Sequence, residues 1–489
     1  MPRYKEIPVS MKYVTDFPVH MGGKTRTCIV REAGLAASGN SEIAPTGNIS
    51  RSPTGNSSKG STGNNDKNAA SNSDISTIGY SNKSRVNVPA YFIDSYDYFY
   101  REGIYCHPDD GERFAFFCNA LLEMLPRIGF KPDIIHCNDW HTGPVCMLLK
   151  EKYSERPFYE GIASIYTIHN LEYQGLFPKE ILALFNIGEE VFIPDKVEFY
   201  GRFNFMKAGL VYANIINTVS ETYAREIQAP CYGEGLDGLL RKREKDLYGI
   251  VNGISCEEFD PLTDKMIYVN YDINRLSSKK QNKYALQKET GLPTGDMPVI
   301  GVVSRLSSQK GFELVIEKID EIMKYDLQLI VLGLGEPYYE RAFLDIRDKY
   351  PGKAAVFIEF NDVLARKIYA GSDMFLMPSR FEPCGLGQII ALRYGTIPVV
   401  RETGGLAETV VDYGRDKANG NGFSFREFSS GALLETLKRA LALYNGSPEE
   451  WHKLVARAME QDFSWSRSAE KYVELYRLAL ERQGKEGQP

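Results

Sequence analysis

The sequence lacks the features that mark membrane, nucleic-acid-binding and disulfide-stabilised proteins. No run approaches the ~18 apolar residues of a membrane span, and the N-terminus lacks the apolar core of a signal peptide. A net charge of −6 leaves no basic surplus for a nucleic acid. The eight cysteines form no Cys-x-x-Cys pair, which favours reduced thiols over a disulfide framework. These absences predict a soluble cytoplasmic protein with neither a membrane nor a nucleic-acid partner.

The chain is longer than one ordinary domain. Its 489 residues predict two domains of roughly 200 residues each. One segment, residues 36–84, is dominated by Ser, Asn, Gly and Thr and separates two β-rich stretches, residues 1–35 and 86–94. Because such a composition buries too little apolar surface to offset its ordering entropy, we expect a disordered insertion there. An inert loop expansion is favoured over a functional tether, since long surface insertions change stability little.

From residue 111 onward, helices alternate with short apolar strands. Residues 111–129 have the i, i+3, i+4 apolar spacing of a helix. The predicted strands of a first series are residues 133–137, 163–168, 214–220 and 247–253. Those of a second series are residues 298–306, 327–335, 354–360, 374–377 and 397–400. Two successive series predict an α/β protein with two Rossmann-like domains, residues 1–253 and 254–465, each with a parallel sheet.

Polar residues follow the predicted strands at their carboxyl ends, which is where open parallel sheets bind ligands. These residues are Asp139, His169, Asn170, Asn252, Arg305, Lys310 and Glu382. A cleft between two facing sheets would bring them together. This expectation depends on the residues and their spacing alone.

The stretch 379–408 carries the most specific signal. It places Glu382, Cys384 and Gly385 in a tight loop that opens a helix, where unpaired backbone N–H groups can bind an anion. A carboxylate before such a turn can accept hydrogen bonds from sugar hydroxyls. Arg305 and Lys310, in the loop SRLSSQKG, supply two cations that could stabilise charge on a departing phosphate. Together these residues predict a site for a sugar nucleotide.

Other motifs are weaker. His136 and His141 flank the sequence CNDW, but His136 falls within a strand and no third ligand is evident, so a metal site is disfavoured. Gly333-Leu334-Gly335 lacks the third glycine and the downstream acid of a dinucleotide fingerprint. Phe360 could stack on a nucleobase or equally lie in the core. Residues 21–24 predict a hairpin turn rather than a phosphate loop.

Seven stretches together resemble the bacterial glycogen synthase and plant starch synthase family. They are PDIIHCNDWHTG, YTIHNLEYQGLFP, VSETYAREI, YGIVNGI, GVVSRLSSQKG, YAGSDMFLMPSRFEPCGL and RYGTIPVVRETGGLAETV. The resemblance covers the chain except residues 36–84. It implies the GT-B architecture of two facing Rossmann-like domains. It also implies retaining transfer of glucose from ADP-glucose to the non-reducing end of an α-1,4-glucan, without a metal or other cofactor.

The resemblance also implies roles for individual residues. Arg305 and Lys310 would bind the diphosphate, and Glu382 would contact the donor glucose. The residues expected beside Glu382 are Cys384, Gly385, Leu386 and Gly387. Those expected on the glucose and acceptor side are Asp139, His169, Asn170, Asn252 and Tyr105. Phe360 would lie near the adenine, and the last helix, within residues 466–489, would cross back to the first domain.

The chain departs from the family pattern in two places. Gly387 stands where the family typically has a threonine. The sequence also begins to match only after the family's first strand, helix and Lys-x-Gly-Gly-Leu loop, so we expect the first domain to lack them. Two hypotheses follow: a glycogen synthase, or a truncated, catalytically impaired paralogue that only binds glucan or nucleotide. A related transferase using another sugar nucleotide remains a third, and the oligomeric state stays open.

Overall fold

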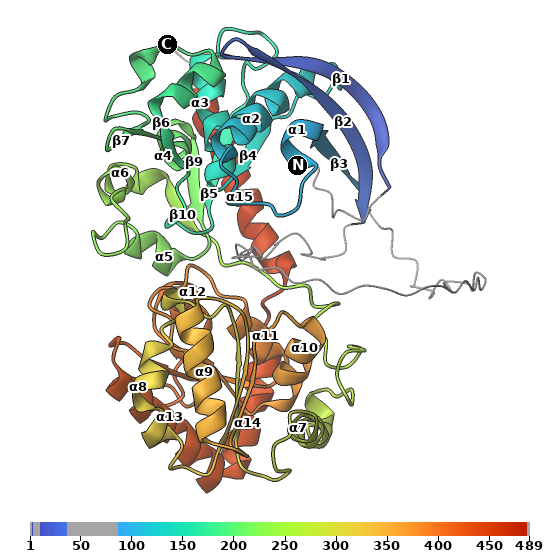
Figure 1. The fold of residues 1–489 in the computed structure, drawn as a ribbon, viewed down its shortest axis with the longest axis vertical. Helices are drawn as coiled ribbons and strands as arrows, with labels where there is room; N and C mark the ends of the chain where they lie inside the picture. Colours follow the sequence, from blue (N-terminus) through green and yellow to red (C-terminus); the bar gives the residue numbers. More distant parts are fainter. Residues whose placement is uncertain (1, 3–9, 37–86, 487–489) are drawn as a thin grey trace, which may run out of the picture.

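The computed structural model describes residues 2, 10–36 and 87–486. The predicted insertion, residues 36–84, therefore lies outside the described residues except for its first one. Figure 1 shows two lobes stacked along the long axis of the molecule. Each lobe is built around one parallel sheet, as the alternation of strands and helices predicted.

The sheet of the first lobe has four parallel strands. In spatial order they are β10 (Leu247–Gly249), β9 (Ile215–Thr218), β5 (Ala163–Ile168) and β4 (Ile134–Asn138). The two central strands, β5 and β9, are buried at every position because elements cover both of their faces. The helices of this lobe are α1 (Tyr96–Phe99), α2 (Asp110–Arg127), α3 (Gly143–Glu151), α4 (Phe205–Tyr212), α5 (Glu221–Glu226) and α6 (Asp237–Lys242).

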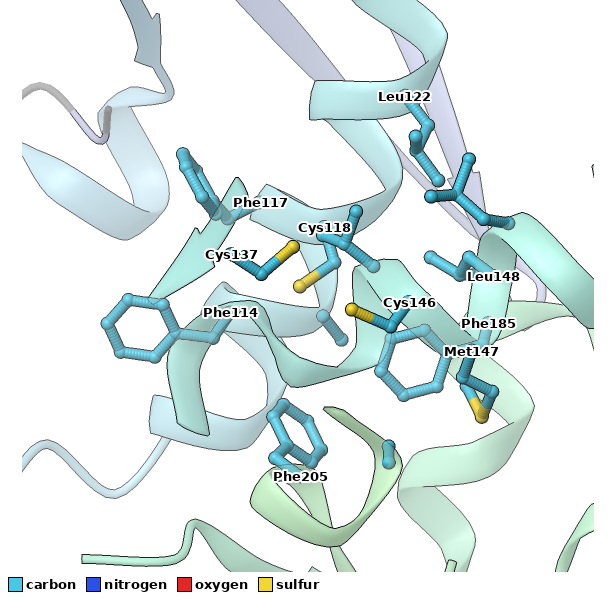
Figure 2. Close-up of a cluster of buried hydrophobic side chains, with 14 of the residues drawn as sticks. Phe114, Phe117, Cys118, Leu122, Cys137, Cys146, Met147, Leu148, Phe185 and Phe205 are labelled. Atoms are coloured by element: carbon cyan, nitrogen blue, oxygen red, sulfur yellow. The ribbon is translucent and has the colours of Figure 1, made fainter. Parts of the chain in front are cut away.

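The core of the first lobe gathers aromatic, aliphatic and sulfur-containing side chains. Figure 2 shows Cys118, Cys137 and Cys146 side by side among phenylalanine, leucine and methionine side chains. The Cys118 thiol donates a hydrogen bond to the carbonyl of His141 at 3.2 Å. All eight cysteines lie in the described part of the chain and all are free, in agreement with the predicted absence of a disulfide framework.

Two antiparallel sheets complete the first lobe. One joins β1 (Lys12–Met21), β2 (Lys24–Ala36) and β3 (Asn87–Asp94), and the other joins β6 (Leu176–Pro178), β8 (Arg202–Asn204) and β7 (Glu198–Phe199). The β1–β2 turn is formed by Gly22 and Gly23 at φ values of 50° and 79°. Positive φ at both central residues is typical of a tight hairpin. The hairpin prediction for residues 21–24 is therefore confirmed.

The sheet of the second lobe has six parallel strands. In spatial order they are β13 (Ala354–Phe357), β12 (Gln328–Leu332), β11 (Val299–Val303), β14 (Met374–Met377), β15 (Ile397–Arg401) and β16 (Phe423–Phe425). The helices are α7 (Ser277–Glu289), α8 (Glu313–Ile322), α9 (Pro337–Lys349), α10 (Asp362–Gly371), α11 (Gly387–Arg393), α12 (Gly404–Thr409), α13 (Ser430–Gly446) and α14 (Pro448–Glu460). The strand order reverses direction between β11 and β14. Such a switch point opens a crevice at the carboxyl ends of the two strands.

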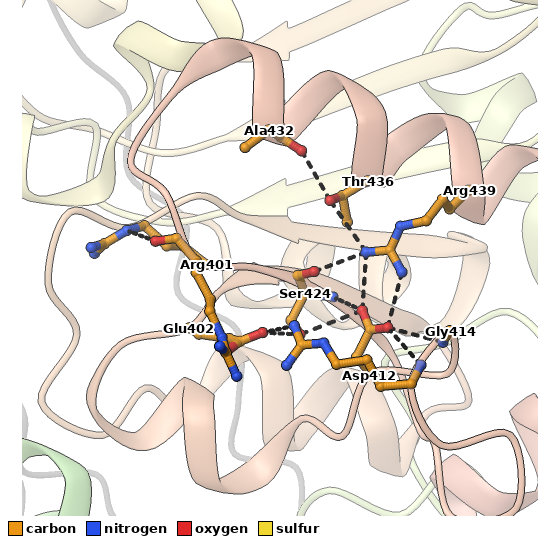
Figure 3. A network of polar contacts seen from close by, with 10 residues as sticks. Arg401, Glu402, Asp412, Gly414, Ser424, Ala432, Thr436 and Arg439 are labelled. Atoms are coloured by element: carbon orange, nitrogen blue, oxygen red, sulfur yellow. Dashed lines mark hydrogen bonds and ion pairs between the residues drawn. The ribbon is translucent and has the colours of Figure 1, made fainter.

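The edge strand β16 was not predicted, and polar contacts hold it in place. Figure 3 shows the Asp412 carboxylate accepting hydrogen bonds from Arg439 and from the backbone of Ser424, which lies in β16. Burial opposes ionisation of Asp412, but these hydrogen bonds outweigh it and lower its pKa. The strand is three residues long, so its position depends on partners distant in the sequence.

The chain passes between the lobes at two adjacent places. The backbone N–H of Ile254 donates to the carbonyl of Phe463 at 2.9 Å, and Gly253 packs directly on the backbone of Trp465. The last helix, α15 (Trp465–Glu486), then enters the first lobe, where Leu475 and Ala479 are buried against β5 and β9. Among the described residues, none of the helices combines the length and apolar composition that a membrane crossing requires.

Candidate active site

Two oppositely charged side chains meet at the switch point of the second sheet. Lys310 follows β11, Glu382 follows β14, and their Nζ and Oε2 atoms lie 2.6 Å apart. The Ser379 hydroxyl donates a second hydrogen bond to the same carboxylate at 3.0 Å. The Lys310 and Glu382 side chains are only 15% and 8% exposed. From the sequence we assigned them to different parts of a ligand, and the structure pairs them directly.

The loop that carries Glu382 lies against the turn that begins α12. The backbone N–H of Gly405 donates to the carbonyls of Glu382 and Pro383 at 3.2 and 3.0 Å. A Cβ atom at Gly404 would lie 1.9 Å from the Glu382 carbonyl oxygen, and one at Gly405 would lie 2.1 Å from that of Cys384. The two backbone segments therefore touch, and glycine is required at both positions.

Replacing Gly405 by alanine is expected to destabilise the protein by roughly 1–3 kcal/mol, because the new methyl group must push the loop of Glu382 aside. Denaturant unfolding measures this change, and the variant should also lose activity. Gly431→Ala is the matched control, since a Cβ atom there meets nothing within 4 Å and the residue lies in helix α13. A Gly405→Ala protein as stable as the control would contradict the close packing.

The remaining residues of this loop differ in exposure and in backbone conformation. Leu386 is exposed. Gly385 adopts a φ of 74°, and Gly387 is the first residue of α11. A Cβ atom at Gly387 would lie 2.9 Å from the ring of Phe375. This contact gives a physical reason for the departure noted at this position, since Phe375 occupies the space that a larger residue would need.

Cys384 is buried beneath the loop and connects it to the segment between the lobes. Burial raises the pKa of its thiol to about 12, although a hydrogen bond with the backbone of Asn252 acts in the opposite direction. A thiol with such a pKa stays protonated near neutral pH and is a poor nucleophile. The structure thus brings Asn252 and Cys384 together and favours a packing role for the thiol.

On the first lobe, Asp139 and His169 meet at the ends of β4 and β5. The Asp139 carboxylate accepts a hydrogen bond from the backbone N–H of His169 at 2.9 Å, and the His169 ring contacts the Asn138 amide oxygen at 2.9 Å. Asp139 has a φ of 57° and a ψ of 177°, a strained conformation for a residue other than glycine. Burial raises its pKa, while the charge of His169 and the backbone of Asn170 oppose that effect.

Tyr105, His136 and His141 lie near this cluster but differ in role. Burial and the charge of Asp139 both raise the pKa of Tyr105, whose ring lies 5.0 Å from that of His141. His141 stacks on Trp140 at 3.8 Å, and His136 contacts the Thr167 hydroxyl at 2.7 Å. Burial lowers the pKa of His136 to about 4 and that of His141 to about 3, so both rings are neutral packing groups at pH 7.

Arg305 faces the first lobe from the second. Its side chain is exposed, and its charge acts on the Glu172 carboxylate, which follows β5. Burial and the neighbouring Glu234 raise the pKa of Glu172, and Arg305 opposes them. Residues that follow strands of the two parallel sheets, Arg305 after β11 and Glu172 after β5, therefore interact across the lobes. Neither Glu172 nor Ser379 was predicted from the sequence. Ser379 could have been found, because it lies only three residues before Glu382 and can reach its carboxylate.

One predicted site residue lies apart from this cluster. Phe360 stands beyond the end of β13, between that edge strand and α10, and is 74% exposed. The prediction that its strand extends to residue 360 is wrong, because β13 ends at Phe357. Burial of Phe360 in the core is likewise contradicted. In the described part of the chain, no three His, Cys, Asp or Glu side chains are grouped to hold a metal ion.

Comparisons with known proteins identify the family of this chain. Residues 58–242 match the family model for the starch synthase catalytic domain, and residues 285–460 match that for glycosyl transferases group 1. A glycogen synthase of Desulforudis audaxviator is 49% identical over 99% of this chain and 89% of its own length. One of Moorella thermoacetica is 49% identical over the same shares.

A solved structure of a starch synthase has a similar fold. The catalytic domain of starch synthase IV from Arabidopsis thaliana, bound to ADP and acarbose, superposes with a TM-score of 0.83 at 30% identity. The superposition covers 98% of this chain and 91% of that one. Similarity of this extent favours a synthase over an impaired paralogue. The chain belongs to the glycogen synthase family of glycosyltransferases and has the GT-B fold.

Proposed function

We propose that this protein transfers glucose from ADP-glucose to the non-reducing end of an α-1,4-glucan, with retention of configuration. The observation that carries the proposal is the Lys310–Glu382 pair at the switch point of the second sheet, together with the Asp139–His169 contact at the strand ends of the first lobe. The ADP and acarbose bound by the Arabidopsis relative support a nucleotide donor and a glucan acceptor.

The donor side consists of fixed cations and a carboxylate. An ammonium group has three donors, so Lys310 can hold Glu382 and a phosphate oxygen at once. Arg305, in the same loop, adds a second cation that can stabilise the charge of the departing diphosphate. Lys310 and Ser379 both contact Oε2 of Glu382, so its other carboxylate oxygen can accept a hydrogen bond from a glucose hydroxyl. The loop residues 384–387 would line the sugar.

The acceptor side is more polar and comes from the first lobe. The groups available are Asp139, His169, Asn170 and Tyr105, with Asn252 between the lobes. Carboxylate, amide and imidazole groups suit sugar hydroxyls, and the exposed edge of Tyr105 suits the apolar face of a sugar ring. These residues would orient the acceptor hydroxyl toward the anomeric carbon of the donor.

The pairing of Glu382 also bears on the reaction. The Glu382 oxygen that contacts Lys310 and Ser379 is engaged in two hydrogen bonds, which weakens it as a covalent nucleophile. Attack of the acceptor hydroxyl on the face of the departing phosphate would then give retention. Closure of the lobes would exclude water and limit hydrolysis of the donor.

The test of the proposed function is the release of ADP from ADP-glucose, measured with and without added glycogen. Release that requires glycogen, together with incorporation of labelled glucose into polymer, is the expected result. UDP-glucose run in parallel reports the donor preference. Binding of glycogen or ADP by a folded protein that transfers no glucose from either donor would overturn the proposal.

Chelation of divalent metals is expected to leave the transfer rate unchanged. Arg305 and Lys310 already place two cations beside the expected position of the diphosphate, so the protein itself supplies positive charge that can stabilise the leaving group. Initial rates with EDTA, with EDTA followed by excess Mg²⁺, and without addition make the comparison. Loss of activity in EDTA that Mg²⁺ restores would contradict this expectation.

A further inference from the structure

A carboxylate of the first lobe is bound to the second lobe beside the candidate active site. Glu226 is the last residue of α5, and α5 and α12 face each other where the lobes meet (Figure 1). Its two oxygens lie 3.0 and 3.2 Å from the Thr403 hydroxyl and both 3.1 Å from the backbone nitrogen of Gly404. Both groups donate to Glu226, so the carboxylate ties the turn that begins α12 to the first lobe.

Two further contacts accompany this one. The backbone N–H of Thr222, in α5, donates to the Glu408 carboxylate of α12. Arg401, at the end of β15, donates to the hydroxyl of Tyr232 in the first lobe at 3.3 Å. Burial raises the pKa of Glu226, and Glu408 acts in the same direction, whereas the Gly404 and Thr403 hydrogen bonds and the charge of Arg401 oppose them. Polar groups of both lobes therefore contribute to the interface around Glu226.

The same turn supports the main chain of Glu382. The hydrogen bond from Gly405 to the Glu382 carbonyl, and the lack of room for a side chain at Gly404, place the two backbones in direct contact. Gly404 therefore contacts both the Glu226 carboxylate and the main chain of Glu382. A shift of the α12 turn would move Glu382 with it.

We propose that Glu226 is a positioning residue for glucosyl transfer, holding Glu382 in register with Asp139 and His169 of the opposite lobe. The inference rests on the proposed function, because it concerns the alignment of donor and acceptor groups. These groups lie on different lobes, and the register between lobes must be fixed by contacts across the interface. A misplacement of about 1 Å at a reacting centre can reduce a rate by about 10²-fold.

The charge and shape of Glu226 both matter to this role. A carboxylate offers acceptors on both oxygens, and hydrogen bonds to a charged acceptor are stronger than those to a neutral one. Glutamine keeps one acceptor oxygen but presents an amide group that cannot accept. Glu226→Gln should therefore retain part of the contact, and Glu226→Ala none of it.

The test compares wild type, Glu226→Gln, Glu226→Ala and the control Glu221→Gln. Glu221 lies on the same helix with an exposed side chain and is outside the interface contacts described. We expect Glu226→Ala to lower kcat by about 10²-fold and Glu226→Gln by about 10-fold, with the KM values for ADP-glucose and glycogen and the affinity for ADP near those of wild type. The control should behave as wild type.

Hydrogen exchange provides a readout that does not depend on turnover. The amides of residues 382, 384–386 and 404–406 should exchange faster in Glu226→Ala, while those of β11 and β14 keep their protection. A kcat for Glu226→Ala equal to that of wild type overturns the inference. So does a loss of kcat that is matched by a loss of folded protein and absent from Glu226→Gln. Failure of wild type to transfer glucose instead overturns the proposed function, and the positioning role with it.

Discussion

Glu382→Ala is expected to lower kcat for glucosyl transfer by about 10²- to 10³-fold, because under the proposed function it removes a fixed charge from the site of the donor sugar. The carboxylate is 8% exposed and is held by Lys310 and Ser379, so its position does not depend on the substrate. Glycogen-dependent release of ADP at saturating substrate measures the effect. Glu382→Gln, which keeps the shape and loses the charge, shows how much of the effect is electrostatic.

The control is Glu317→Ala, an exposed carboxylate on α8 of the same lobe. Its kcat should stay at the wild-type value, and the far-ultraviolet circular dichroism of all three variants should coincide. A Glu382→Ala protein that is folded and transfers glucose at the wild-type rate would remove Glu382 from the site. The proposal of a sugar-nucleotide site at this switch point would then have to be abandoned.

Lys310→Met should reduce both activity and stability. Under the proposed function, the variant loses one of the two cations that would bind the diphosphate, which is expected to lower kcat by about 10²-fold. It also leaves the Glu382 carboxylate buried without its cation, and breaking a buried ion pair in this way destabilises by about 3 kcal/mol. Steady-state kinetics and denaturant unfolding measure the two effects separately.

The double variant Lys310→Met/Glu382→Gln separates pairing from chemistry. With no charge left to bury, it should recover most of the lost stability, while its transfer activity stays at or below that of Lys310→Met. Lys318→Met on α8 is the matched control, because Lys318 pairs with Glu321 on the surface and should change stability little. If Lys310→Met unfolds like this control, the pair does not stabilise the second lobe.

The sequence was most informative where one physical rule decides the structure. Apolar runs such as residues 163–168 became central strands because both faces of a parallel sheet are covered. Gly22 and Gly23 were recognisable as a hairpin because few residues adopt positive φ. The polar residues at strand ends could be chosen as site candidates for a similar reason, since ligands of open parallel sheets bind at the carboxyl edge.

Features that depend on partners distant in the sequence were missed. Lys310 and Glu382 are 72 positions apart, and their pairing follows from the reversal of strand order between β11 and β14. Strand β16 is only three residues long and is held by the Asp412–Arg439 contact. Phe360 shows a different limit, because an aromatic residue after an apolar strand looks the same whether it is buried or 74% exposed.

The return of α15 to the first lobe has a consequence for biosynthesis. The face of the first sheet that buries Leu475 and Ala479 is formed by residues translated some three hundred positions earlier, such as Ala163 and Ile165. The ribosome must therefore complete the whole second lobe before this face is covered. The second lobe, whose strands lie within residues 299–425, can close its sheet during translation. The first lobe is thus synthesised first, but its core is completed last, when α15 packs on its sheet.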